Sequence, residues 1–290
     1  MSVSKGWIKM IKPGPYTSIQ DGGRWEGIEK GVPSGGCMDM LAARLANALL
    51  GQKEEKPCLE IFMGGVSFSL EKGRCQVAFC GADAEIRING EAVVLGKIID
   101  LQEGDQIEIM PFSAGQWLYM SLAGNFLVPK VLGSHSFYFP ITKKARLEKG
   151  DLVPLEGGET LPPTNSYLGN YSIPFRDKVR VYLGPDFSKL KKEQQEELLN
   201  RVYTVSKRQN RMGIMLEEVI ENDLLDPLSS PVFPGTIQLT PSGNLIVMMR
   251  DAQVTGGYPR VLEVEERDIG KLAQKRPGEQ FAFVSDFVDF

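Results

Sequence analysis

The sequence predicts a mainly β fold with a few short helices. Most of the chain consists of short apolar or alternating runs that are separated by Gly, Pro and Asn. Many short strands at this spacing favour closed or sandwiched β structure over alternating βαβ units. With 290 residues, 42% hydrophobic and 24% charged, the chain has the profile of a soluble globular protein with one large or two ordinary domains.

The predicted strands continue through both halves of the chain. They cover residues 65–70, 75–80, 84–88, 92–95, 106–110, 116–122, 178–183, 202–205, 236–239, 245–249 and 261–264. The best hairpin signal is Asn89-Gly90 between two of these runs, because a type I′ turn needs two residues with positive φ.

Three predicted helices interrupt the strands. The first ends at Gly51, a favourable residue just beyond a helix. Its expected apolar face consists of Met38, Leu41, Ala42, Leu45 and Leu49. The second is a charged surface helix over residues 189–201. Its anchoring residues are Leu190, Leu198 and Leu199. The third covers residues 268–274 and ends before Pro277-Gly278.

A domain boundary is expected within residues 156–166, which lack periodicity and are rich in turn-forming residues. It divides the chain into an N-terminal β subdomain with one helix, residues 1–165, and a C-terminal β subdomain, residues 166–290. Both halves have the size of ordinary domains.

Charge and composition exclude several classes of partner. The net charge of −4 gives no general electrostatic argument for nucleic acid or an acidic membrane. The N-terminus has no apolar core of the signal-peptide type, and no apolar run approaches the roughly 20 residues that span a bilayer. None of the four cysteines belongs to a Cys-x-x-Cys pair, which indicates reduced thiols and a cytoplasmic protein.

A single histidine, His135, restricts the possible chemistry. A zinc site would need mostly cysteine ligands, and the cysteine spacing does not support one. A Ser-His-Asp hydrolase would have to use His135, but no Gly-x-Ser-x-Gly elbow is present. The sequence also has no P-loop and no Gly-x-Gly-x-x-Gly turn. His135 is therefore interpreted as a polar loop residue.

The first candidate segment, residues 17–24, places three polar side chains around Gly22-Gly23. They are Gln20, Asp21 and Arg24. Arg24 could pair with Asp21, or its planar guanidinium could bind a carboxylate or phosphate.

The second segment, residues 31–39, leads through Gly35 and Gly36 into a helix N-terminus, where an anion could bind. Ser34 and Asp39 could instead cap that helix.

Two further segments are equally open to interpretation. Residues 207–213 carry Asn210 and Arg211 and could form a solvated basic turn or an anion site. Residues 234–243 form a strand that carries Gln238 and then turns.

The most informative segment is residues 250–260, which joins two strand-like runs. It places five polar side chains around Gly256-Gly257, far more than a simple turn needs. They are Asp251, Gln253, Thr255, Tyr258 and Arg260. Loops held by rigid strands are where binding and catalysis concentrate.

These segments together resemble the KipA family, also called allophanate hydrolase subunit 2, the biotin-dependent carboxyltransferase family, or the 5-oxoprolinase C subunit (PxpC). The resemblance covers nearly the whole chain. The motifs that carry it occur in residues 18–24, 31–39, 46–47, 59–60, 81–83, 132–134, 183–186, 210–213, 234–238, 251–253 and 256–259.

The resemblance implies two β subdomains related to the cyclophilin-like barrel. It also implies a KipI-like (PxpB-like) partner and a PxpA-like partner, with which ATP-dependent opening of 5-oxoproline to glutamate takes place. ATP would then act at the level of the complex. No biotin is expected on this chain, because it has no Met-Lys-Met sequence. Two alternatives remain: an antagonist that binds a KipI-like kinase inhibitor, and a carboxyltransferase component acting on urea or a similar small amide.

Opening a lactam under ATP requires cationic or N–H groups for the developing charge and a carboxylate for proton transfer. The candidate catalytic residues are Asp251, Tyr258 and Asp21. The candidate substrate- or anion-binding residues are Gln20, Arg24, Gly35, Gly36, Asp39, Asp83, Asn210, Arg211, Gln238, Gln253, Gly256, Gly257 and Arg260. No metal site is expected.

The chain departs from the family pattern in three places. Arg250 stands where relatives usually have a small residue, and His135 stands where many have Arg. Residues 230–233 replace a Ser-Glu-Gly-like stretch.

Overall fold

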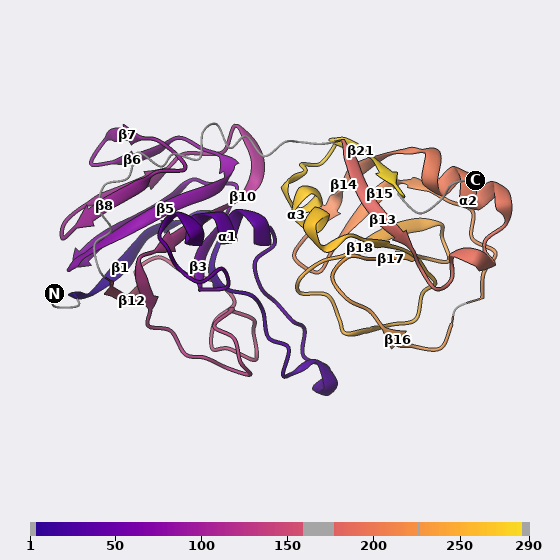
Figure 1. The fold of residues 1–290 in the computed structure, drawn as a ribbon, viewed down its shortest axis with the longest axis horizontal. Coiled ribbons are helices and arrows are strands. Elements are labelled where there is room, and N and C mark those ends of the chain that lie inside the picture. The colour runs from indigo at the N-terminus through magenta and orange to yellow at the C-terminus, as the bar shows by residue number, and fades with distance from the viewer. Residues whose placement is uncertain (1–3, 159–176, 226, 286–290) are drawn as a thin grey trace. The chain divides into compact units, whose positions relative to one another are not determined.

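The computed structural model describes residues 4–158, 177–225 and 227–285. The chain divides into two compact units, one made of Met1–Trp25 and Gly35–Pro174 and the other of Glu26–Ser34 and Phe175–Phe290. The expected boundary between residues 165 and 166 lies outside the described residues. Strands dominate both units, so the predicted mainly β fold with a few helices is confirmed (Figure 1).

The first unit contains a seven-stranded and a five-stranded sheet, and its neighbouring strands are antiparallel. The order in the larger sheet is β11 (Gly124–Phe126), β12 (Leu152–Gly157), β1 (Ser4–Pro13), β4 (Val66–Lys72), β9 (Gln106–Ile109), β6 (Ile86–Ile88) and β7 (Glu91–Val93). The order in the smaller sheet is β2 (Tyr16–Gln20), β3 (Cys58–Phe62), β10 (Ala114–Leu122), β5 (Arg74–Asp83) and β8 (Ile98–Gln102).

One apolar core joins these two sheets. Phe68 and Ile107 from the larger sheet and Phe79 and Leu118 from the smaller sheet are all fully buried in it. Burying a side chain of this size contributes roughly 1.5–3 kcal/mol. The core therefore fixes the strands whose ends carry the polar segments of this unit.

The predicted hairpin at Asn89-Gly90 is confirmed. Ile88 pairs with Glu91, and both turn residues have positive φ, 51° and 87°. The turn therefore has the backbone that its sequence requires.

Helix α1 (Met40–Leu49) packs on β5 and β10 and is followed, as predicted, by Gly51 with a φ of 60°. Its predicted apolar face is wrong at Leu41, which is 51% exposed. The buried side chains are Ala42, Ala43, Ala46 and Asn47. Small side chains let the helix approach the sheet closely, and Ser121 on β10 donates a hydrogen bond to Asn47. The helix therefore packs on the sheet through its alanines and Asn47.

The second unit contains a closed barrel and, among its described residues, two helices (Figure 1). The strand order is β13 (Lys178–Leu183), β20 (Arg260–Val264), β17 (Thr236–Leu239), β18 (Asn244–Met248), β15 (Gly213–Val219), β14 (Val202–Gln209) and β21 (Gln280–Val284). The pair β13–β21 is parallel and closes the barrel. A short ladder outside it pairs β16 (Ser230–Pro231) with β19 (Thr255–Gly256).

The helices of the second unit lie close to their predicted positions. Helix α2 is Lys192–Asn200 and follows the 3-10 turn η2 (Phe187–Lys189); helix α3 is Glu266–Gln274. The first unit's sequence is interrupted by the 3-10 turn η1 (Ile28–Lys30), which belongs to the second unit. Among the described residues, no helix has the length and apolar character needed to cross a membrane.

Candidate functional site

The segment between β18 and β20 folds back over the barrel through the β16–β19 ladder. Gln238 on β17 lies beneath it, 1% exposed, and its Nε2 donates a hydrogen bond to the Tyr258 carbonyl at 3.3 Å. A Cβ on Gly256 would lie 2.4 Å from this Nε2, so a side chain at this position would require the Gln238 amide to shift. Glycine at 256 lets the backbone pass close to the Gln238 amide without moving it.

Arg211 and Asp251 hold the start of this segment. Arg211 Nε and Nη2 donate to the two Asp251 carboxylate oxygens at 2.7 and 2.9 Å, and the Asp251 N–H donates to the Arg211 carbonyl at 2.8 Å. Both side chains are buried, so the interpretation of residues 207–213 as a solvated turn is wrong for Arg211. The candidate catalytic carboxylate is thus in a two-pronged ion pair, and its role in proton transfer stays a prediction.

A pocket of about 470 Å³ on the barrel brings together four of the predicted residues, Asn210, Gln238, Gln253 and Tyr258. The other residues that line it are Lys207, Arg208, Gln209, Met212, Gly213, Met215, Ile246 and Met248. Apolar methionines with a few amide groups are typical of a site for a small organic ligand, and the two basic residues add a place for a negative group.

The methionines were not predicted from the sequence. Strand register explains why they face the pocket: Met215 pairs with Ile246, and Ile246 pairs with Gln238 on the next strand. Residues paired across neighbouring strands lie on the same face of a sheet. Their alternation could have been recognised, but the strand order that aligns them does not follow from the sequence.

The remaining predicted residues of this unit lie outside the pocket lining. Arg260 Nη1 donates to the Pro231 carbonyl at 3.2 Å, and the Arg260 N–H donates to Asp186 at 2.9 Å. Gly257 has room for a side chain, with no heavy atom closer than 3.9 Å to an added Cβ. Arg250 is buried and pairs with Glu266 of helix α3 at 2.8 Å, so this departure from the family pattern anchors the segment to the helix.

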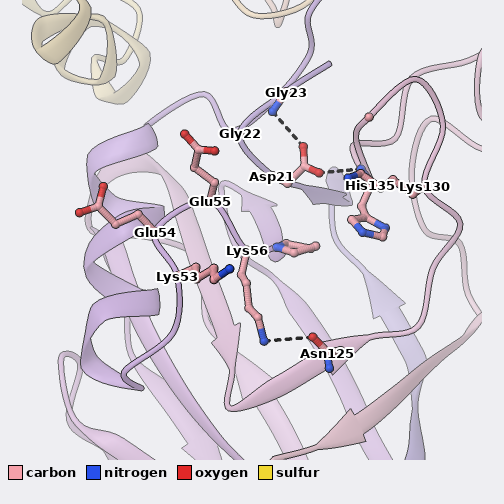
Figure 2. A pocket seen from close by; sticks show the side chains of 12 residues that line it. Asp21, Gly22, Gly23, Lys53, Glu54, Glu55, Lys56, Asn125, Lys130 and His135 are labelled. Atoms are coloured by element: carbon pink, nitrogen blue, oxygen red, sulfur yellow. Dashed lines mark hydrogen bonds between the residues drawn. The ribbon is translucent and has the colours of Figure 1, made fainter. Parts of the chain in front are cut away.

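Asp21 lies in the first unit, at the end of β2 (Figure 2). Its carboxylate accepts hydrogen bonds from the Ser134 hydroxyl at 2.5 Å, the Ser136 hydroxyl at 2.7 Å, the His135 N–H at 2.6 Å and the Gly23 N–H at 2.9 Å. These bonds tie residues 134–136 to the β2 end. Asp21 therefore holds residues 134–136 in place. A catalytic role for Asp21 stays a prediction.

Gln20 and Arg24 contact the same loop. Gln20 Nε2 donates to the Phe137 carbonyl at 3.2 Å, and Arg24 Nη2 donates to the Ser136 carbonyl. Arg24 is fully buried, so the guanidinium lies inside the unit.

The glycine turn that precedes α1 also packs here. Gly35 and Gly36 have φ values of 62° and 96°. A Cβ on Gly36 would lie 3.1 Å from the Asp21 carbonyl oxygen. Glycine is therefore favoured at position 36, because the backbone there is left-handed and because it passes close to the Asp21 carbonyl.

The two candidate caps of α1 have different roles. Asp39 Oδ1 accepts the Ala42 N–H at 3.1 Å, which confirms capping by Asp39. Ser34 instead donates to the Arg250 carbonyl at 3.3 Å, within the second unit. Asp83, at the end of β5, accepts the Ser113 hydroxyl at 2.6 Å and lies on the surface, outside the lining of the barrel pocket.

Fold and sequence together define a carboxyltransferase-type domain. Residues 30–285 match the family model of the carboxyltransferase domain, subdomain A and B, and the chain belongs to this family. It is 31% identical to the C subunit of the Escherichia coli 5-oxoprolinase, over 96% of this chain and 90% of that protein. It is 30% identical to the C subunit of the Haemophilus influenzae 5-oxoprolinase, over 92% and 87%. These matches confirm the resemblance that the motifs indicate.

Larger proteins contain a similar region. The urea amidolyase of Saccharomyces cerevisiae is 27% identical over 96% of this chain but only 16% of its own length. The crystal structure of TTHA0988 superposes with a TM-score of 0.84 at 29% identity, and the match covers 97% of this chain but 55% of that chain. The Kluyveromyces lactis urea amidolyase has the same fold, with a TM-score of 0.83 at 23% identity, over 98% of this chain and 19% of that chain.

Proposed function

We propose that this chain is the C subunit of an ATP-dependent 5-oxoprolinase, which opens 5-oxoproline to glutamate together with PxpA-like and PxpB-like subunits. The observation that carries the proposal is the nearly end-to-end match with two bacterial 5-oxoprolinase C subunits, which the chain covers to 90% and 87%. The urea amidolyases, in contrast, are covered to only 16–17% of their length.

The barrel pocket supports this assignment chemically. 5-Oxoproline carries a lactam amide and a carboxylate, and the pocket lining supplies amide side chains and two basic residues, Lys207 and Arg208. Asn210 Oδ1 accepts the Met212 N–H at 2.7 Å, which leaves its NH₂ group as the donor it offers to a ligand. Gln238 uses its NH₂ group on Tyr258, which leaves its carbonyl oxygen as the acceptor. In this proposal the lactam C=O and N–H meet these two amides.

The amide must also be activated before water can attack it. Phosphorylation of the amide oxygen by ATP would turn a poor electrophile into a good one. Tyr258 in the pocket lining and Asp251, which is paired with Arg211 outside the lining, are the proposed groups for orientation and proton transfer.

Reconstitution tests the proposal. The chain is mixed with its PxpA-like and PxpB-like partners, ATP and 5-oxoproline, and glutamate is measured. Tyr258→Phe should lower kcat/KM at least tenfold, whereas Tyr182→Phe, at another exposed tyrosine of the barrel, should leave it unchanged. A well-folded complex that forms no glutamate would contradict the proposal.

A carboxyltransferase acting on urea or a similar small amide is the second candidate, because the family model describes a carboxyltransferase domain and the amidolyases share it. Its test uses carboxylated biotin and urea in place of ATP and 5-oxoproline. Carboxyl transfer without glutamate formation would favour this second function.

A further inference from the structure

The outer face of the larger sheet in the first unit carries large apolar side chains that the fold itself does not use. The inner face of this sheet packs on the smaller sheet through their shared core. Helix α1 packs on β5 and β10, which belong to the smaller sheet (Figure 1). An antiparallel sheet with one solvated face normally directs apolar residues inward and polar residues outward. Strands β1 and β12 depart from this rule.

Strand β1 has an outward row in which apolar and charged side chains alternate. Ile8 and Met10 lie in the core, so Trp7, Lys9 and Ile11 point to the other side. A register shift after Met10 leaves the next residue on this side as well, because it pairs with Ser67, the neighbour of the core residue Phe68. The outward row is therefore Lys5, Trp7, Lys9, Ile11 and Lys12.

The neighbouring strand continues the apolar surface. Pro154 pairs with Trp7, and Leu152 pairs with Lys9. Residues paired across neighbouring strands lie on the same face. Leu127 follows β11 and donates its N–H to the Pro154 carbonyl at 2.8 Å, which places it beside β12. We call this surface the β1–β12 face; its apolar residues are Trp7, Ile11, Leu127, Leu152 and Pro154.

Exposure and size distinguish the β1–β12 face from isolated apolar residues at a surface. Its large apolar side chains range from 38% exposed for Trp7 to 56% for Leu152. With strands about 4.8 Å apart and a rise of about 3.4 Å per residue, the face is roughly 14 Å wide from β11 to β4 and roughly 24 Å long. Contiguous exposed apolar surface of this kind marks interaction sites. It has a suitable size for the centre of an interface that covers about 800 Å² on each partner.

Lysines surround the apolar residues. Three belong to β1, and the fourth, Lys72 on β4, places its Nζ 5.5 Å from the centre of the Trp7 ring. Among the described residues, neither Lys9 nor Lys12 has an ion-pair partner. The carboxylates at the margins are engaged locally, since Glu156 lies opposite Lys5 and Glu71 accepts the Ser69 hydroxyl at 2.6 Å. The face is therefore apolar with a positive rim.

This charge decides which occupant fits. In a two-fold symmetric dimer the same surface patch contacts its own copy. Lys9 and Lys12 would then approach lysines of the second copy, and facing like charges across an interface is unfavourable. A surface with an apolar centre and a rim of carboxylates complements the face instead.

We propose that the β1–β12 face is the docking surface for another subunit of the complex, which meets it with an apolar centre and a rim of carboxylates. Trp7 and Leu152 fill the centre of the contact, and Lys9 and Lys12 pair with the carboxylates. The inference rests on the proposed function for the existence of a partner subunit, but it uses neither the barrel pocket nor its substrate.

Direct binding measurements test the proposal. The full chain is immobilised and titrated separately with the purified PxpB-like and PxpA-like subunits, at low and high salt. Trp7→Ser and Lys9→Glu should each weaken the binding of one of these subunits at least tenfold. Lys9→Glu should also reduce the salt dependence of binding, because it removes an attractive charge. Both side chains are exposed, so the variants should unfold at the temperature of the wild type.

Matched control variants lie on the other side of the first unit's core. Leu41 is an exposed apolar residue of α1, and Lys53 is an exposed lysine that follows this helix. Leu41→Ser and Lys53→Glu repeat the two chemical changes and should leave the affinity for both subunits unchanged. Equal weakening by the controls and by the variants of the β1–β12 face would overturn the proposal.

The remaining outcomes separate this proposal from the proposed function. Wild-type affinity of Trp7→Ser and Lys9→Glu, in a complex that forms glutamate, contradicts the docking surface alone. A complex that both variants weaken, but that forms no glutamate, contradicts the proposed function alone. A wild-type chain that binds neither subunit overturns the docking surface. Sedimentation of the chain by itself tests the symmetric alternative, because a dimer that Trp7→Ser dissociates would assign the face to a second copy and also overturn the proposal.

Discussion

Arg211 and Asp251 form a buried, two-pronged ion pair, with N–O distances of 2.7 and 2.9 Å, although 40 residues separate them in the chain. The pair joins the turn after β14 to the segment after β18, and both segments contribute residues to the barrel pocket. Its two members were predicted separately, one to bind an anion and one to transfer a proton. Because the two side chains contact each other, removing one charge leaves the other buried without its partner, whereas removing both leaves no unpaired charge.

Asp251→Asn should abolish glutamate formation in the reconstituted complex and lower the free energy of unfolding by about 3–5 kcal/mol, because it leaves the Arg211 charge buried without its counterion. The double variant Arg211→Met/Asp251→Leu removes both charges and should recover most of the stability. Denaturant unfolding and the glutamate assay measure the two effects. Wild-type turnover in the double variant would show that the pair is only structural.

Gly256→Ala should disturb the pocket because the new methyl group would lie 2.4 Å from Gln238 Nε2. Gln238 must then move away from Tyr258, and we expect a higher KM for 5-oxoproline and a loss of about 1–3 kcal/mol of stability. Gly257→Ala is the matched control, since its methyl group would meet nothing closer than 3.9 Å. Similar kinetics for both variants would contradict the proposed role of the Gln238 amide.

Local sequence patterns predicted the local parts of the fold. Asn89-Gly90 forms its hairpin, Gly51 follows the first helix, and Asp39 caps it, because each depends on the backbone preferences of a few neighbouring residues. The strand β1 (Ser4–Pro13) was missed even though its buried residues alternate at Gly6, Ile8 and Met10. The buried face of α1 was misassigned at Leu41, because the small side chains that fit against the sheet, and not the spacing of large apolar residues, determine which side of the helix is buried.

The candidate sites could be predicted only in part, because their contacts cross long stretches of chain. Asp21 reaches Ser134 over 113 residues, and Lys56 reaches Gly124 over 68. Composition and motif order contain no information on such pairings. Motifs therefore identified Asn210, Gln238, Gln253 and Tyr258. The lysines in the pocket beside Asp21, which are Lys53, Lys56 and Lys130, belong to no motif and were found only from the structure (Figure 2).

Glu263 should make the stability of the barrel fall between about pH 4.5 and pH 7. Burial raises the pKa of its carboxyl from 4.5 to about 7, against the opposing effects of Thr236 and Arg260. Between these values the unfolded chain has lost the proton that the folded chain retains, so unfolding becomes more favourable as the pH rises. Glu263→Gln should therefore raise the free energy of unfolding at pH 8 relative to wild type, and this difference should vanish near pH 4. An equal effect at both pH values would contradict the assignment.

Asp268 should have the opposite dependence. Its burial acts to raise the pKa, but hydrogen bonds from Arg180 and the charge of Lys271 outweigh this and lower it to about 2. Arg180 contacts both carboxylate oxygens, at 2.8 and 3.2 Å, and Lys271 lies 2.7 Å from one of them. Because the folded pKa lies below the usual 3.8, the stabilisation is complete above that value and is lost as the pH falls toward 2. Asp268→Asn should thus destabilise the chain at pH 7 and lose its effect near pH 2. Urea unfolding across this range, with Asp177→Asn as an exposed control, distinguishes this ion-pair effect from a loss of packing, which would be independent of pH.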